Sequence, residues 1–287
     1  MILLVDSGTS KCDWVFVDKK QHDKHFDIRT QGINPSYHTE NEILGIINNH
    51  NDFLAVKSHV EKIYFFGAGC GTEDAVKKME EILRKFFFNS KLIHVTGDIE
   101  GAVYSCVEGN AVVCILGTGS NSCYYDGDQI QLRVPSLGYS VMDDGGGSQI
   151  GRDCLRAYFY NKMSPALKAD FEARYNPDIA QIREQLYHGR DRSQFLAGFA
   201  RFVVEHKDNE LMQSILRHQI RSFFDNHIEM YKHELENDPI YFVGAMAYHN
   251  KEIIELLCNE KGFNLVQCIE RPILAMAERV DDIEKYF

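Results

Sequence analysis

The chain has 287 residues, with 31 Lys and Arg against 42 Asp and Glu, which gives a formal net charge of −11. This length is enough for two lobes of ordinary domain size, each with its own core. An apolar fraction of 44% and a charged fraction of 25% are typical of a globular protein and exclude a disordered one. The acidic balance argues against general nucleic-acid binding, which needs a basic face, but it allows a nucleotide whose phosphates are held by backbone amides and a metal ion.

The sequence predicts neither a signal peptide nor a membrane span. The N-terminus lacks a basic region, and Asp6 interrupts its apolar run too early. Apolar runs such as 111–116 are too short to cross a bilayer. The eight cysteines contain no CxxC pair, and several, such as Cys114, lie in apolar strand-like runs where a reduced, buried thiol is expected. We therefore expect a protein of the reducing cytoplasm that binds no membrane.

Strand and helix patterns alternate through the first third of the chain. Thr39 and Glu42 have the spacing of a capping box, so a helix should begin there. A second helix is expected from residue 73, where apolar residues recur at helical spacing up to residue 87. Strands are expected at 2–5, 14–17, 25–30, 62–66 and 92–95.

The same pattern then restarts, which indicates an internal duplication. A shift of 109 residues, from Gly8 to Gly117, aligns the dipeptide Gly8-Thr9 with Gly117-Thr118 and keeps the order of the flanking strands. Asp126-Gly127 is a hairpin signal within the second copy. Strands are expected here at 111–116, 122–125 and 129–134.

Helices should dominate from 150 to 232, a short strand returns at 240–243, and helical patterns continue to the C-terminus. No low-complexity linker separates the two copies. The sequence thus predicts an N-terminal lobe at 1–110 and a C-terminal lobe with a helical insertion at 111–287, joined by a compact hinge. This prediction allows the last helix of the chain to pack back on the N-terminal lobe.

Each copy contains a glycine and hydroxyl turn directly after a buried strand, at 8–10 and at 117–120. Such turns offer successive backbone N–H groups to an anion. Either turn alone is more simply a hairpin, but two at matching positions, with Asp6 at the end of the first strand, favour phosphate binding. Other nucleotide motifs are excluded: the run 146–153 has Arg152-Asp153 where a P-loop requires Lys and Ser or Thr, and no GxGxxG occurs.

Three segments occur in order along the chain: MILLVDSGTSKCDW, LGTGSNS and YFVGAMA. They resemble the two phosphate motifs and the adenosine motif of the sugar kinase, hsp70 and actin superfamily. Within it, the chain most resembles the N-acetylglucosamine kinase and BadF/BadG/BcrA/BcrD ATPase family, over nearly its whole length through Glu270–Leu274. The resemblance implies an α/β, duplicated ribonuclease H-like (actin-like ATPase) fold, with two lobes and a central cleft.

The resemblance also implies ATP and Mg²⁺ as cofactors. Asp6 would orient the hydrated Mg²⁺, the two glycine turns would contact phosphate, and the segment after residue 243 would hold adenosine. The implied ATP-binding residues are Asp6, Gly8, Thr9, Ser10, Gly117, Thr118, Gly119, Gly244 and Ala247.

Asp98 matches the catalytic aspartate of the family. A sugar hydroxyl that attacks the γ-phosphate needs a positioned carboxylate to accept its proton. From the sequence alone, Asp98 is more simply the N-cap of the helix that follows it. The resemblance makes the catalytic role the preferred interpretation of Asp98. The residue could serve as both catalytic base and N-cap.

The resemblance implies that Asn34, Thr118, Asn121 and Asp143 hold sugar hydroxyls. Simpler interpretations are a turn residue before proline for Asn34 and a solvated acidic pair for Asp143-Asp144. The sugar region departs from the family pattern: Pro135–Gly138 replaces Gly-Gly-Trp-Gly, MDDGGGS replaces GDEGSG, and Ala245 replaces a glycine.

These observations predict a kinase that transfers the γ-phosphate of ATP to a hydroxyl of an amino sugar, most simply N-acetylglucosamine. Its partners would be the sugar and ATP, without nucleic acid or membrane, and a homodimer is common in the family. One alternative is the iron–sulfur ATPase activator of a 2-hydroxyacyl-CoA dehydratase, but the sequence has no cysteine–glycine cluster at the start of its second lobe, and Cys70 and Cys154 stand alone. The other alternative is a non-enzymatic, actin-like ATP-binding regulator.

Overall fold

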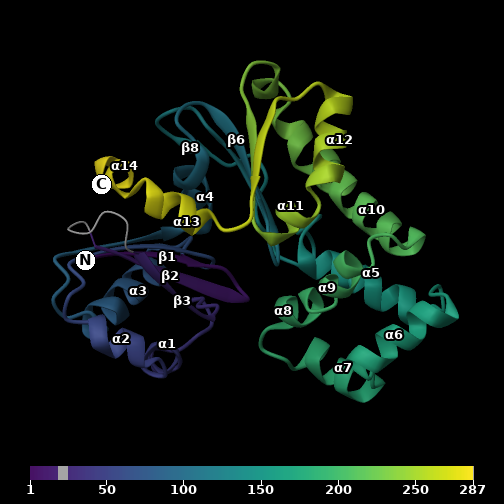
Figure 1. Ribbon diagram of the computed structural model, residues 1–287, viewed down its shortest axis with the longest axis horizontal. Coiled ribbons are helices and arrows are strands. Elements are labelled where there is room, and N and C mark those ends of the chain that lie inside the picture. The colour runs from purple at the N-terminus through teal and green to yellow at the C-terminus, as the bar shows by residue number, and fades with distance from the viewer. Residues whose placement is uncertain (19–24, 287) are drawn as a thin grey trace. The chain divides into compact units, whose positions relative to one another are not determined.

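A computed structural model of the chain describes residues 1–18 and 25–286. It divides into two compact units (Figure 1). Unit 1 comprises Met1–Glu108 and Arg271–Phe287, and unit 2 comprises Gly109–Glu270. The first connection lies close to the predicted hinge. The chain then returns to unit 1 at residue 271, so unit 2 is a continuous insertion in unit 1. The predicted C-terminal lobe, which extended to residue 287, was therefore too long.

Unit 1 is built on a five-stranded mixed sheet in the order β3-β2-β1-β4-β5. β1 pairs antiparallel with β2, and β2 with β3, whereas β1, β4 and β5 run parallel. All five predicted strands are confirmed, with ends one or more residues longer. They are β1 (Ile2–Ser7), β2 (Lys11–Val17), β3 (His25–Gln31), β4 (Lys62–Gly67) and β5 (Leu92–Gly97).

Both faces of this sheet are covered by helices, because alternate residues of β1 and β2 are apolar on both sides. Leu3 and Trp14 pack with α1 (Glu40–Asn48), α2 (Asn51–Val56) and α3 (Glu73–Phe86). The predicted capping box at Thr39 and Glu42 is present at the start of α1. On the other face, Ile2, Leu4 and Val15 belong to a cluster with the C-terminal helices. The helices of that face are α4 (Asp98–Cys106), α13 (Pro272–Glu278) and α14 (Val280–Tyr286).

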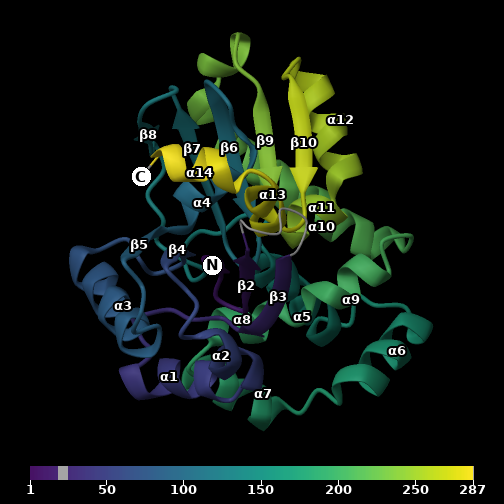
Figure 2. The ribbon, with the colours of Figure 1, turned by 60° about the vertical axis from the view of Figure 1, so that its left-hand side comes forward.

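Unit 2 repeats the topology, with the sheet order β8-β7-β6-β9-β10 and the same pattern of parallel and antiparallel pairs. Figure 2 shows its strands side by side. The predicted duplication and the α/β fold class are therefore confirmed. The strands are β6 (Ala111–Leu116), β7 (Ser120–Tyr125), β8 (Ile130–Gln131), β9 (Ile240–Val243) and β10 (Leu265–Ile269). Two predictions were wrong. The third strand, β8, pairs over two residues and not over 129–134, and a strand, β10, forms where a helix was expected.

The helices of unit 2 form two layers of core. One cluster joins β6 and β9 to α10 (Glu210–Asn226) and α12 (Lys251–Lys261), through residues such as Cys114, Phe223 and Ile254. A second cluster lies among the helices of the insertion, around Phe171 and Phe202. The helices are α5 (Gly147–Phe159), α6 (Pro165–Tyr175), α7 (Ile179–Tyr187), α8 (Arg192–Ala197), α9 (Ala200–Glu205), α10 (Glu210–Asn226), α11 (Ala245–His249) and α12 (Lys251–Lys261), with 3-10 turns at Ile228–Tyr231 and Glu234–Glu236. Across the described residues, we find no helix with the length and apolarity needed to span a membrane.

Candidate functional site

In unit 1, the carboxyl ends of three parallel strands meet at one edge of the sheet. Ser7 at the end of β1 is in register with Gly67 of β4, and Gly67 is in register with Gly97 of β5. The parallel register therefore brings Asp6, which precedes Ser7, and Asp98, which follows Gly97, to the same edge. Ligands of open α/β sheets bind at this end of the strands.

Asp6 is only partly exposed, and its carboxyl group is difficult to ionise. Withdrawal from water, followed by the negative charges of Asp13 and Asp98, raises its pKa to about 7. Lys11 and Arg271 act in the opposite direction. A carboxylate with this pKa gains from a nearby cation, since a positive charge would relieve the repulsion.

Asp13 lies opposite Asp6 in the β1–β2 register and is buried. Two arginines compensate its charge. Arg29 Nε donates to Asp13 Oδ1 at 2.7 Å, and Arg271 Nη2 donates to the same oxygen at 3.0 Å. Arg271 also donates to Asp27 Oδ2 at 2.7 Å, so the strand pair β2–β3 is joined to the segment that returns from unit 2.

The first glycine turn is fixed to the loop that carries Asn34. Ser7 Oγ donates to the Ile33 carbonyl and accepts from the Ile33 N–H, both at 2.9 Å. A Cβ at Gly32 would lie 2.3 Å from the carbonyl oxygens of both Gly8 and Thr9, so only glycine fits there. The Gly8 N–H donates to the Lys11 carbonyl at 3.0 Å, which closes the turn.

Asn34 lies against the loop after β4. A Cβ at Gly69, whose φ is +84°, would lie 2.0 Å from Asn34 Oδ1. The same Oδ1 accepts from the Ser36 N–H at 2.9 Å, and Ser36 Oγ donates to the Gly69 carbonyl at 3.0 Å. Asn34 is thus a turn residue whose half-buried amide is held at this edge.

Asp98 is the first residue of α4, and the N-cap is Gly97, which makes no side-chain cap hydrogen bond. The interpretation of Asp98 as the cap was therefore wrong by one residue. A carboxylate in the first turn is stabilised by the helix dipole. Asp98 also helps to raise the pKa of the nearby Cys70 thiol to about 12, after burial as the larger cause.

In unit 2, the second glycine turn is joined to the start of α5. Gly117 N donates to the Gly119 carbonyl at 3.0 Å. The N–H groups of Gly147 and Ser148 donate to the carbonyls of Gly117 and Thr118, at 2.8 and 2.9 Å. The turn carbonyls of Gly117, Thr118 and Gly119 and the Gly117 N–H are thereby used within the protein, which fixes the shape of the turn.

Asp143 is buried beside this turn, in a left-handed conformation with a φ of 70°. Its Oδ1 accepts from the Ser120 N–H at 3.2 Å, and a Cβ at Gly119 would lie 2.7 Å from its Oδ2. Burial raises the pKa of Asp143. Asp144 accepts from Asn226 Nδ2 at 2.8 Å, so the interpretation of the two acids as a solvated pair was wrong.

Gly244 joins the end of β9 to the second glycine turn. Its φ is +108°, and a Cβ there would lie 2.5 Å from the Leu116 carbonyl oxygen. Ala247 and Asn121, the other predicted site residues of this unit, do not contact the turn through a missing Cβ as Gly244 does. The Ala247 side chain is fully buried in the core of unit 2. Asn121 is half-buried at the start of β7, where its Oδ1 accepts from the Ser122 N–H at 2.9 Å.

The carboxylates of unit 1 suit a hydrated Mg²⁺ better than a metal held by protein side chains alone. Among the described residues, no group of three or more His, Cys, Asp or Glu side chains could hold a metal ion. Mg²⁺ does not require such a cage, because it is usually bound through one or two carboxylates, water and substrate phosphates. The mutual repulsion of Asp6, Asp13 and Asp98 fits such an ion.

An iron–sulfur cluster fits less well. Cys70 and Cys154 are both buried, and burial raises the pKa of each thiol to about 12. A ligand to iron must be a thiolate, which these surroundings disfavour.

Sequence reasoning did not identify Asp13, Arg29 and Arg271. The sequence did contain a signal for Asp13, because this acid interrupts the apolar run of β2, where a buried charge needs a partner. Arg29 and Arg271 could not be identified as its partners, because both lie far from Asp13 along the chain and no local pattern links them to it. The close contacts of Gly32 and Gly69 were likewise missed.

No family model matches the sequence. The structure is similar to a solved protein from Porphyromonas gingivalis that bears the provisional name N-acetylglucosamine kinase. The two chains are 29% identical, with a TM-score of 0.86 over 99% of this chain and 100% of that chain.

Two more distant structures show the same fold. A protein from Chromobacterium violaceum with the same provisional name is 12% identical, with a TM-score of 0.69 over 96% of this chain and 97% of that chain. A ROK family glucokinase from Streptomyces griseus, solved with glucose and AMPPNP, is 11% identical, with a TM-score of 0.62 over 97% and 98% of the two chains. The full-length match to the first protein and the common fold of all three agree with the ordered motifs of the sequence. The chain therefore has the actin-like ATPase fold and is similar over its whole length to a protein provisionally named as a sugar kinase.

Proposed function

We propose that the protein is an ATP-dependent kinase that transfers the γ-phosphate to a hydroxyl of an amino sugar, with N-acetylglucosamine as the first substrate to test. The observation that carries this proposal is the polar edge of unit 1, where Asp6, the turn 8–10, the Asn34 loop and Asp98 meet at the ends of parallel strands. The likeness to the Porphyromonas gingivalis protein supports the choice of sugar.

The nucleotide would use both glycine turns. Gly8, Thr9 and Ser10 in unit 1, and Gly117, Thr118 and Gly119 in unit 2, would contact the phosphates, while the N–H groups of Gly8 and Gly117 close the turns themselves. Gly244 would let adenosine approach the backbone, as it lies next to the second turn. Ala247, whose side chain is buried in the core, would likewise let adenosine approach the backbone at the start of α11. The AMPPNP bound by the Streptomyces griseus glucokinase supports a nucleotide in this fold.

Asp98 would be the general base. It would take the proton of the attacking sugar hydroxyl while the hydroxyl oxygen bonds to the γ-phosphorus and the bond to the β–γ bridging oxygen breaks, releasing ADP. Asn34, Thr118, Asn121 and Asp143 would orient the sugar. Asp6 would hold a hydrated Mg²⁺, which when bound neutralises charge on the phosphates.

The test is an ADP-release assay over a panel of sugars and amino sugars with Mg²⁺, with the products identified by mass. We expect sugar-dependent ADP release and a sugar product heavier by one phosphoryl group. ATP binding with no phosphorylated product from any sugar would contradict the proposal and favour the actin-like regulator. A coloured, iron-containing protein would favour the dehydratase activator instead.

A further inference from the structure

A cavity of about 300 Å³ lies in unit 2 between α5 and α10, lined by none of the residues assigned above to ATP or sugar. Its polar wall is formed by Asp153 and Arg156 of α5, Lys162 of the following loop, and His218 of α10. The cavity is open to solvent, since Arg156, Lys162 and His218 are all exposed.

Two cations of this wall are uncompensated. Arg156 and Lys162 form no ion pair with any carboxylate in the part of the chain that the structure describes. The guanidinium carbon of Arg156 lies 5.6 Å from the centre of the Tyr160 ring, which also lines the cavity. Two unpaired cations on one cavity are notable in a chain with a net charge of −11, where acidic partners are abundant.

The one carboxylate of the wall is engaged elsewhere. Asp153 Oδ2 accepts from Gln219 Nε2 at 2.6 Å, and its Oδ1 lies 3.7 Å from Arg152 Nε. Its charge is therefore partly compensated from outside the cavity. The charge that the cavity presents to a ligand is positive.

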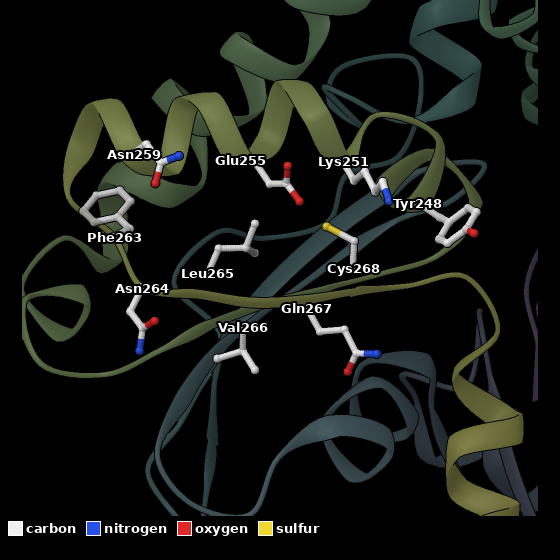
Figure 3. Close-up of a pocket in the computed structure, with 10 residues that line it drawn as sticks. All are labelled: Tyr248, Lys251, Glu255, Asn259, Phe263, Asn264, Leu265, Val266, Gln267 and Cys268. Carbon is white, nitrogen blue, oxygen red and sulfur yellow. The ribbon is translucent and has the colours of Figure 1, made fainter.

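A second cavity, of about 420 Å³, provides a comparison (Figure 3). It lies between α12 and β10, and Lys251 and Glu255 extend into it from neighbouring turns of the same helix. One cation and one anion leave this cavity without net charge. Size alone therefore does not distinguish the two cavities, whereas charge does.

We propose that the cavity between α5 and α10 binds a small phosphoryl anion, with Arg156 and Lys162 bonding the phosphoryl oxygens and His218 donating a ring N–H. Guanidinium and ammonium groups form short, charge-assisted hydrogen bonds with phosphate. The cavity volume leaves room for a small carbon skeleton on the phosphate. This site is separate from the proposed transfer reaction and does not depend on it.

The experiment is a calorimetric titration of the full chain with inorganic phosphate and, separately, with glycerol 3-phosphate, at constant ionic strength. The variants are Arg156→Gln, Lys162→Gln and Asp153→Asn, with Lys251→Gln in the second cavity as the matched control. Arg156 and Lys162 are exposed side chains, so these substitutions should leave the fold intact, which thermal unfolding will verify.

We expect saturable binding that weakens about tenfold in Arg156→Gln or Lys162→Gln and is unchanged in Lys251→Gln. Asp153→Asn should bind more tightly, by roughly threefold, because it removes the negative charge while its side-chain oxygen can still accept from Gln219. If both probes bind with equal affinity, the site recognises the phosphate group itself. If glycerol 3-phosphate alone binds, the site recognises a phosphate ester. Absence of binding, or binding that Arg156→Gln and Lys162→Gln leave unchanged, would overturn the proposal.

Discussion

The pairing of Asp6 with Asp13 across adjacent strands is an unfavourable arrangement that the protein compensates mainly at Asp13. Like charges directly opposite in a sheet destabilise it. Arg29 and Arg271 compensate Asp13, whereas Asp6 keeps a pKa of about 7. Sites where a local rule is broken in this way are frequently functional sites.

The stability of unit 1 should therefore depend on pH through Asp6. Its pKa in the fold, about 7, exceeds the ordinary value of 3.8, so the folded state binds its proton more tightly than the unfolded state does. The contribution to stability is present in full below pH 4 and is lost as the pH rises toward 7. Asp6→Asn should thus stabilise the protein at pH 8 by roughly 2 kcal/mol and have little effect at pH 4.

Urea unfolding of both proteins at the two pH values, without divalent cations, measures this difference. A stabilisation that is equal at pH 4 and pH 8 would rule out the ionisation of Asp6 as its cause.

Asp98→Asn should abolish phosphoryl transfer, with a loss in kcat of at least about a hundredfold, because general-base catalysis contributes 10²- to 10⁴-fold. ATP affinity and the midpoint of thermal unfolding should change little. The matched control is Glu100→Gln, which removes a charge from the same first turn of α4 and should keep most of the activity. If both variants lose activity equally, the effect belongs to the helix terminus rather than to a base.

At the scale of elements, the two copies of strand, turn and strand were predictable because their signals are local. β1 and β6 are apolar runs that end in glycine turns, and a shift of 109 residues aligns the sequence of one with the sequence of the other. β10 was not predictable in the same way. Its residues Val266 and Gln267 are exposed, so this edge strand lacks the apolar alternation that identifies a buried strand.

The site was predictable only in part for a related reason. Residues at strand ends, such as Asp6 and Asp98, could be identified from the strand pattern and the family resemblance. The contacts that fix them are long-range: Gly32 against Gly8, and Gly69 against Asn34. No local pattern in the sequence encodes those contacts, because they arise only when separate loops reach the same edge of the sheet.

The loop after β4 offers a test of how the fold positions Asn34. Gly69→Ala would place a Cβ in a left-handed backbone conformation and 2.0 Å from Asn34 Oδ1. We expect a loss of stability of about 1–3 kcal/mol and a rise in KM for the sugar that exceeds the change in KM for ATP. Gly71→Ala is the control, since nothing lies within 4 Å of its Cβ. Thermal unfolding and steady-state kinetics separate the two effects, and equal behaviour of the two variants would contradict this role of Gly69.

At the scale of the molecule, unit 1 is completed by the two ends of the chain. Ile2 and Leu4 of β1 share a buried cluster with Ile273 and Ile283 of the C-terminal helices. Unit 2 has a core of its own, in which Ile254 is equally buried. The two cores should therefore respond separately to substitution.

Ile273→Ala should destabilise unit 1 by roughly 2–5 kcal/mol, as expected for a cavity in a well-packed core. Hydrogen exchange should then show faster exchange in the described parts of 1–108 and little change in 109–270. Ile254→Ala, the matched substitution in unit 2, should give the reverse pattern. Faster exchange throughout the chain in both variants would show that the two units unfold together.

The return of the chain to unit 1 at Arg271 also sets an order for folding during synthesis. The ribosome completes unit 2 before it has made α13 and α14, which cover one face of the first sheet. Until those residues emerge, α13 and α14 cannot cover Ile2, Leu4 and Val15, and a sheet face left partly exposed in this way favours aggregation. A nascent chain stalled after Glu270 should therefore have a protease-resistant unit 2 and a protease-sensitive unit 1, and chaperones that bind apolar surface should act mainly on unit 1.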